Sequence, residues 1–269
     1  MITYSATLDV PEETATLLTD LLVAERLRRG TGVGARAASA RDQAVLVLRW
    51  FREDTPLPTL ARDAGVSTAT GYRYLHEGID ALAAHAPDLH QVLEAGKAAG
   101  WTHVVLDGTL IRTDRCRVTN PDTGHDLWFS GKHHTHGGNV QIVSDPDGHP
   151  VAVSDVEPGS THDLAAARAT GFLGALHAAA ALLGLSTLAD KGYDGAGAGV
   201  LTPTKGGNLH PDNAARNQLL GCLRAQGERG IALLKTRWKA LGRIRLCPQR
   251  IGAITKAALV LTNAERPIR

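Results

Sequence analysis

The sequence predicts an α/β domain preceded by an all-helical domain, and three observations lead to this prediction. Apolar residues recur at helical spacing up to about residue 96. After that point short β-rich segments alternate with helical ones. An apolar content of 43% with 21% charged residues is typical of a globular protein. We therefore expect helices over residues 1–96 and a mixed sheet flanked by helices over residues 97–269.

The first helices are indicated by apolar spacing and by breakers. Residues 17–29 form an amphipathic run that ends at the glycines of GTGVG. Residues 39–51 follow with helical apolar spacing, and Ser39 is suited to cap them. A connecting helix over about residues 82–100 closes the predicted domain.

The segment TLARDAGVSTATGYRYLHEGI has the spacing of a helix-turn-helix. A short helix around residues 60–64 would be followed by a turn at Gly65 and a second helix from about Ser67 or Thr68. Thr68, Thr70 and Arg73 would then face DNA. Similar helix pairs occur in proteins that bind no DNA. The balance of nine basic against 13 acidic residues over 1–96 also counts against DNA binding here.

The second half of the chain changes to a period of two. WTHVVLDGT predicts a strand that ends in Asp107, and NVQIVSDPDGHPVAVSDV predicts a β-hairpin around a Pro-Asp-Gly turn. STLADKGY predicts a further short strand that ends in Asp190. Helices are expected over residues 163–184, about 211–226, 228–241 and 249–264.

Charge and cysteine content restrict the class of protein. From Val200 onward 13 Lys and Arg residues stand against three acids. This excess indicates either a polyanionic partner such as nucleic acid or a solvated basic face. Three isolated cysteines form neither a disulfide framework nor a paired zinc motif. No apolar run approaches the roughly 18 residues of a membrane helix, and the N-terminus lacks the pattern of an export signal. We expect a cytoplasmic protein without a membrane partner.

Three acids stand at positions suited to chemistry. Asp107 and Asp190 end predicted strands, where ligands of open α/β sheets gather. Glu228 opens a predicted helix that can lie across the same edge. Three oxygen donors without cysteine suit Mg²⁺ or Mn²⁺. Each acid also has a structural interpretation: a turn at Asp107, an Asx-turn from Asp190 to Gly192, and a helix N-terminus at Glu228.

Several motifs in order resemble one family. LDGT, FSGKHHTHGGNVQIVSDPDG, PGSTHDLAAAR, LADKGYDG and the ER…LLK helix together are similar to the insertion-sequence-five family of bacterial transposases. That family is a branch of the DDE superfamily similar to the eukaryotic Harbinger-type transposases. The resemblance runs from about Val104 to Leu259.

The resemblance implies a ribonuclease-H-like core whose catalytic Asp107, Asp190 and Glu228 bind two Mg²⁺ or Mn²⁺ ions. It implies nicking of double-stranded DNA at transposon terminal inverted repeats and joining of the 3′-OH to target DNA, by a homo-oligomer on DNA. The alternatives are a DNA-binding regulator derived from a transposase, which neither cuts nor joins, and a nuclease that cuts without joining.

Further residues flank this predicted site. Asp163 in GSTHD competes with Asp190 as the second metal-binding carboxylate, although it is also suited to cap a helix. Lys132 belongs to a basic loop, SGKHHTHGGN, which favours DNA contact over zinc because it holds no cysteine and no framed His pair. Lys235 lies two helical turns after Glu228 on the same face and is suited to hold a DNA phosphate, or else to be an exposed solubilising charge.

Overall fold

The computed structural model describes residues 6–32, 34–121 and 124–266. The first five residues, part of the segment in which we expect no export signal, lie outside these ranges. The N-terminal half begins with helices as predicted. They are α1 (Glu12–Arg28), α2 (Ala40–Glu53), α3 (Leu57–Asp63), α4 (Thr68–Ala83) and α5 (Leu89–Ala98).

Local signals in the sequence set the ends of these helices. Ser39 caps α2 in a capping box with Asp42, which confirms the predicted cap. The turn between α3 and α4 contains Gly65 at φ +67°, a conformation that glycine adopts without strain. Ser67 then accepts a hydrogen bond from the backbone N–H of Thr70 and caps α4.

The second half forms a mixed sheet. Its strands are β1 (His103–Arg112), β2 (Phe129–Ser130), β3 (Thr135–Ser144), β4 (Pro150–Pro158), β5 (Ser186–Leu188) and β6 (Val200–Leu201). The order is β2-β3-β1-β5-β6, and β4 also pairs with β3. β1 is antiparallel to β3 and parallel to β5. The hairpin of β3 and β4 confirms the prediction made from the Pro-Asp-Gly turn.

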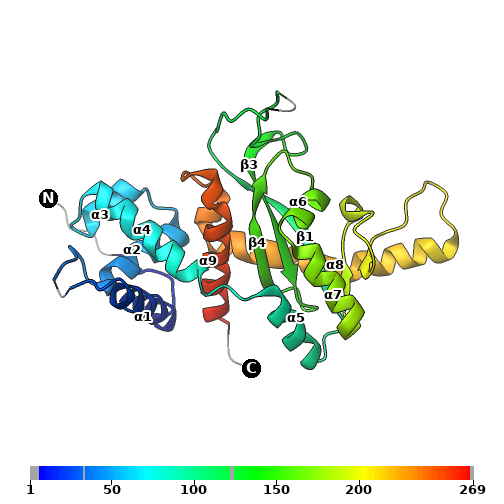
Figure 1. Ribbon diagram of the computed structural model, residues 1–269, viewed down its shortest axis with the longest axis horizontal. Coiled ribbons are helices and arrows are strands. Elements are labelled where there is room, and N and C mark those ends of the chain that lie inside the picture. Colours follow the sequence, from blue (N-terminus) through cyan, green and yellow to red (C-terminus); the bar gives the residue numbers. More distant parts are fainter. Residues whose placement is uncertain (1–5, 33, 122–123, 267–269) are drawn as a thin grey trace.

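Helices cover both faces of this sheet (Figure 1). They are α6 (Asp163–Ala169), α7 (Phe172–Leu183), α8 (Pro211–Arg237) and α9 (Ile251–Ala264). Val104 and Leu106 of β1 pack with α5, α6 and α7 in one apolar cluster. Ile111 of the same strand packs with α9 and the end of α8 in another. The alternation of side chains along β1 thus places a helical layer on each side.

Three predicted helix boundaries are wrong. The connecting helix predicted over about residues 82–100 begins only at Leu89, where Asp88 caps α5. The single helix predicted over residues 163–184 is broken, since Gly171 adopts φ +77° and separates α6 from α7. The two helices predicted on either side of Gly227 are one, because α8 runs without interruption for 27 residues. Its first turns, and the connection that precedes them, project away from the sheet (Figure 1).

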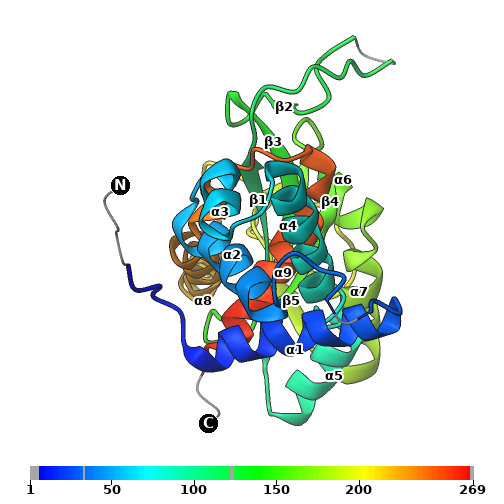
Figure 2. The ribbon, with the colours of Figure 1, turned by 90° about the vertical axis from the view of Figure 1, so that its left-hand side faces the viewer.

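The N-terminal helices pack against the C-terminal one. Residues of α1, α2, α3 and α4 share an apolar cluster with α9, and Figure 2 shows these helices grouped in front of it. Residue 96, where we place the domain boundary, lies within α5, which packs against α7. The division into 1–96 and 97–269 stays a prediction.

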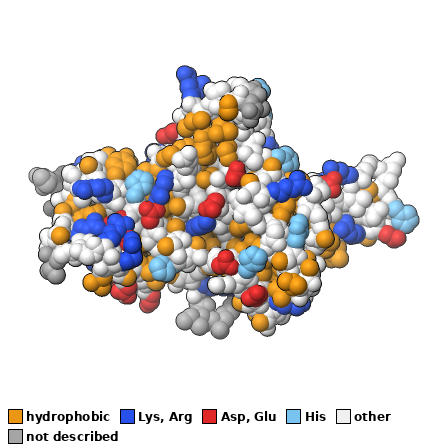
Figure 3. Space-filling model, viewed as in Figure 1, with side chains coloured by type: hydrophobic (Ala, Val, Ile, Leu, Met, Phe, Trp, Pro, Cys, Tyr) orange, Lys and Arg blue, Asp and Glu red, His pale blue; other side chains and the backbone are white. Residues whose placement is uncertain are grey.

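Charged side chains of both signs cover the N-terminal helices. Figure 3 shows Lys and Arg side chains gathered over this part of the visible face, with Asp and Glu among them. Arg28 pairs with Glu25, and Arg49 pairs with Asp63. Among the described residues, no single helix is long and apolar enough to cross a membrane; α6 and α7 meet that test only together, across an 80° bend.

Candidate active site

Asp107 lies in the middle of β1 and not at its end, so the predicted strand boundary is wrong. β1 continues to Arg112 because residues 105–112 pair with β3. On its other side β1 pairs with β5 only as far as Val105. Asp107 therefore stands where β1 loses one of its two neighbours, and this position leaves room beside its carboxylate.

Asp190 follows the end of β5 by two residues and faces the same region. Its Oδ1 accepts a hydrogen bond of 2.7 Å from the backbone N–H of Gly192. A Cβ at Gly192 would lie 2.9 Å from that oxygen, so glycine leaves room for the turn. The Asx-turn considered from the sequence is present, and Asp190 also acts electrostatically on Asp107. Turn formation and a place beside Asp107 are compatible.

The charge at Asp107 is poorly compensated. Burial, and after it the negative charge of Asp190, raise the pKa of Asp107 to about 6. Arg224 of α8 and the N–H of Gly108 act in the opposite direction but do not outweigh burial. Two neighbouring carboxylates with too little positive charge form an environment that favours a bound cation.

Asp163 lies against the same strand from the other face. A Cβ at Gly108 would be only 2.7 Å from Asp163 Oδ1, so the glycine admits this carboxylate. Asn139 donates to Oδ1 at 2.7 Å, and the ammonium of Lys132 lies 3.0 Å from Oδ2. The charges of Asp163, Asp190 and Asp107 all raise the pKa of Lys132. Lys132 is thus a cation within the carboxylate cluster.

A buried polar chain fixes Asp163, and sequence reasoning missed it. The hydroxyl of Tyr193 donates to Gln141, whose side-chain amide donates to Asn139, which in turn donates to Asp163. The signal was present in NVQIV, because Asn139 and Gln141 are polar residues two apart on one face of a buried strand.

Glu228 lies inside α8 and does not open a helix, so that part of the prediction is wrong. Its side chain is exposed to solvent. It lies one turn after Arg224 and two turns before Lys235 on one helix face. Arg224 acts on Asp107, while Lys235 donates to Thr109. Glu228 therefore lies between two residues that both reach β1.

Two glycines allow α8 to approach the sheet this closely. A Cβ at Gly227 would lie 2.4 Å from Val105 Cγ1, and one at Gly230 would lie 2.6 Å from Ser144 Oγ. Glycine inside a helix costs about 1 kcal/mol relative to alanine, so its presence here has a packing reason. The predicted helix break at Gly227 is therefore wrong, because the close contact of Gly227 with Val105 lets α8 continue along the sheet.

The donor chemistry suits a divalent cation, although the ligands are not assembled. Across the described parts of the chain, no three His, Cys, Asp or Glu side chains are grouped to hold a metal ion. The oxygens of Asp163 are engaged by Asn139 and Lys132, and Glu228 points to solvent. Asp107 and Asp190 offer the hard oxygen donors that Mg²⁺ prefers. A complete set of metal ligands around Asp107 and Asp190 requires movement of the Asp163 or Glu228 side chain.

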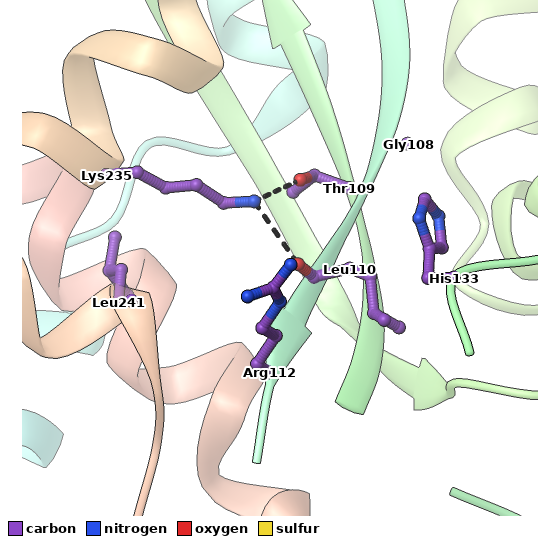
Figure 4. Close-up of a pocket in the computed structure, with 8 residues that line it drawn as sticks. Gly108, Thr109, Leu110, Arg112, His133, Lys235 and Leu241 are labelled. Atoms are coloured by element: carbon purple, nitrogen blue, oxygen red, sulfur yellow. Dashed lines mark hydrogen bonds between the residues drawn. The ribbon is translucent and has the colours of Figure 1, made fainter. Parts of the chain in front are cut away.

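A basic cavity adjoins the carboxylates along β1. It has a volume of about 320 Å³ and is lined by Gly108, Thr109, Leu110, Arg112, His133, Lys235, Leu241 and Gly242. Lys235 reaches from α8 to β1, where it donates to Thr109 Oγ1 at 2.7 Å and to Leu110 O at 3.2 Å (Figure 4). Lys235 is therefore half-buried and hydrogen-bonded, not an exposed solubilising charge.

The remaining predicted site residues lie on α4 and in the loop before β3. Thr68 and Arg73 are exposed on the first turns of α4, and Thr70 is half-buried. Arg73 donates to Thr70 Oγ1 at 2.8 Å. After that loop, His136 in β3 interacts with Asp126 at 3.1 Å.

Comparison with known proteins identifies the second half of the chain. A family model described as DDE superfamily endonuclease matches residues 106–263, which is more than half of the chain. The match begins beside Asp107 and includes every acid of the site. The N-terminal helices lie outside it. No curated protein and no solved structure shows a significant match to the chain.

Proposed function

The chain belongs to the DDE superfamily endonuclease family, and from this membership we propose that it is a DNA transposase of an insertion sequence. In the proposed reaction it binds transposon ends, nicks the DNA by hydrolysis and joins the freed 3′-OH to target DNA. The mixed sheet flanked by helices is consistent with a DDE nuclease fold, and we assign it to the ribonuclease-H-like type. The motifs shared with the insertion-sequence-five family support this finer assignment.

One observation carries the proposal: Asp107 and Asp190 lie close enough that the charge of Asp190 raises the pKa of Asp107. Glu228 lies on α8 between Arg224, which acts on Asp107, and Lys235, which donates to Thr109. We assign the catalytic, metal-binding roles to these three residues and a supporting role to Asp163. Two Mg²⁺ or Mn²⁺ ions bound there would activate the attacking oxygen and stabilise the leaving one.

The protein's own residues would hold the substrate for two successive displacements. In the first, a water oxygen bonds to phosphorus at the transposon end, and the P–O3′ bond breaks to leave a 3′-OH. In the second, that 3′-OH oxygen bonds to a target phosphorus and displaces a target 3′-OH. Lys132 and Lys235 are placed beside the carboxylates to contact DNA phosphates.

We further propose that the N-terminal helices bind duplex DNA through Thr68, Thr70 and Arg73. Many arginines of these helices are paired with acids, such as Arg28 with Glu25. Among the described residues Arg73 has no acidic partner, so its charge remains available to a phosphate. Assembly as a homo-oligomer on DNA is part of the proposal because two transposon ends must be joined.

Cleavage by single-residue variants tests the function. Purified protein with Mg²⁺ or Mn²⁺ should cut DNA that carries the inverted repeats flanking its coding region. Asp107→Asn, Asp190→Asn and Glu228→Gln should each abolish cutting while binding persists. An uncut substrate beside an active control transposase would contradict the proposal.

Three further outcomes would change the proposal. Nicks without joined product would indicate a nuclease that does not transfer strands, and DNA binding without metal binding would indicate a regulator. Activity retained in Asp190→Asn but lost in Asp163→Asn would make Asp163 the second carboxylate.

A further inference from the structure

Two cations, Arg112 and Lys235, line the cavity beside Thr109. Arg112 is exposed at its rim and Lys235 forms one wall (Figure 4). Within the described residues, neither side chain forms an ion pair, although other arginines near this end of the sheet do. Arg243, next to the cavity residue Gly242, pairs with Asp114 at 2.7 Å.

The electrostatic environment of the cavity reflects this excess of positive charge. Burial lowers the pKa of Lys235, and the charge of Arg112 lowers it further, whereas the charge of Asp107 acts in the opposite direction. The pKa of His133 is lowered by burial and by the cations Lys132, Lys235 and Arg112, against the opposite effect of Asp163. Like charges held together destabilise one another, and an anion between them would reverse that effect.

Arg112 and Lys235 differ in the number of N–H donors that remain free for a ligand. The ammonium of Lys235 has three N–H donors, of which two already bind Thr109 and Leu110. The guanidinium of Arg112 forms no hydrogen bond with any described residue, so its planar set of donors is free. Arginine also matches a phosphate with two parallel hydrogen bonds, which a lysine cannot do.

We propose that this cavity is a subsite for a phosphodiester of the DNA strand and that Arg112 is its main contact. Lys235 adds charge and holds α8 against β1. The proposal rests on the proposed function, because it takes DNA as the substrate of the neighbouring carboxylates. It assigns to Arg112 a role that no sequence motif indicated.

The position of Arg112 fixes which phosphate it can reach. Arg112 follows Asp107 by five residues, which corresponds to about 16 Å along a strand. That separation is too large for the phosphate that reacts at Asp107, so Arg112 contacts one farther along the DNA. Such a contact is the same in the ground state and the transition state, and its loss should raise KM and leave kcat unchanged.

The test compares Arg112→Gln with Arg243→Gln, an equal loss of charge at a neighbouring arginine that is already paired. Binding of a short fluorescein-labelled duplex is measured by anisotropy with Ca²⁺, between about 50 and 200 mM salt. Arg112→Gln should bind about tenfold more weakly, with the slope of log K against log salt smaller by about 0.9. Arg112→Lys should keep most of the slope, which preserves the test if the glutamine variant does not fold.

Four outcomes separate this subsite from the proposed function. A larger loss in Arg112→Gln than in Arg243→Gln, with KM raised in plasmid cleavage with Mn²⁺, supports the subsite. Equal affinities in both variants and the wild type overturn the subsite and leave the proposed function intact. A wild type that cuts no DNA, with binding still dependent on Arg112, overturns only the proposed function. A wild type that does not bind the duplex overturns both.

Discussion

Replacement of Gly227 by alanine tests whether close contact between α8 and β1 builds the site. An alanine Cβ at this position would lie 2.4 Å from Val105 Cγ1 and 2.9 Å from Val105 Cβ. Overpacking of this kind costs typically about 1–3 kcal/mol. Against this, replacing glycine by alanine in a helix contributes about 1 kcal/mol of stability. We expect Gly227→Ala to be destabilised by up to about 2 kcal/mol.

The same helix supplies the control. Gly221 also lies within α8, but a Cβ there would meet nothing within 4 Å. Gly221→Ala should therefore be stabilised by up to about 1 kcal/mol. The free energies of unfolding, measured in urea, should differ between the two variants by about 1–3 kcal/mol.

Cleavage provides a second readout of the same change. A shift of α8 away from β1 would move Lys235 from Thr109 and Arg224 from Asp107, so Gly227→Ala should also lose activity, unlike Gly221→Ala. Equal stabilisation of both variants, with cleavage preserved, would refute the view that Gly227 brings the helix to the sheet.

Three further predictions concern individual charges. Because burial and Asp190 raise the pKa of Asp107 to about 6, above its ordinary 3.8, the folded protein binds this proton more tightly than the unfolded chain, and ionisation above pH 6 costs stability. Asp107→Asn should therefore raise the free energy of unfolding by about 1–3 kcal/mol at pH 8 in the absence of divalent cations. That gain in the free energy of unfolding should vanish near pH 4. A gain that grew towards low pH would contradict the raised pKa of Asp107. Lys132→Met should bind Mn²⁺ about two- to fivefold more tightly by titration calorimetry, because an exposed ion pair with Asp163 is worth at most about 1 kcal/mol. The control is Lys191→Met, which removes an exposed charge that forms no ion pair with any described residue, and it should show a smaller gain. Arg73→Ala should weaken duplex binding and reduce its salt dependence, whereas Arg28→Ala, paired with Glu25, should not.

Local features could be predicted from the sequence where a few neighbouring residues decide the outcome. Ser39 and Ser67 cap their helices as their types and positions indicate. The β3–β4 hairpin follows from a turn whose residues favour it, and β5 from a short β-rich run. In each case the interactions lie within a few residues of one another.

Features that depend on distant contacts could not be predicted in this way. LDGT indicated a strand end, but β1 continues past Gly108 because β3 supplies hydrogen-bonding partners from another part of the chain. Gly227 indicated a helix break, but its intrinsic cost is offset by contact with Val105. No motif in the sequence marks Arg112 as a site residue. Lys235 lines the same cavity only because α8 packs against β1.

The competition between Asp190 and Asp163 can be judged by which oxygens remain free. Asp190 uses one carboxylate oxygen to accept from Gly192, a neutral backbone donor, and its second oxygen has no hydrogen bond from any described residue. Asp163 has both oxygens engaged, and one of them faces the ammonium of Lys132, whose charge repels a metal ion. A cation that approaches Asp107 therefore meets less resistance at Asp190. This difference favours Asp190 as the second metal-binding carboxylate and makes Asp163 the residue that can join only after Lys132 moves.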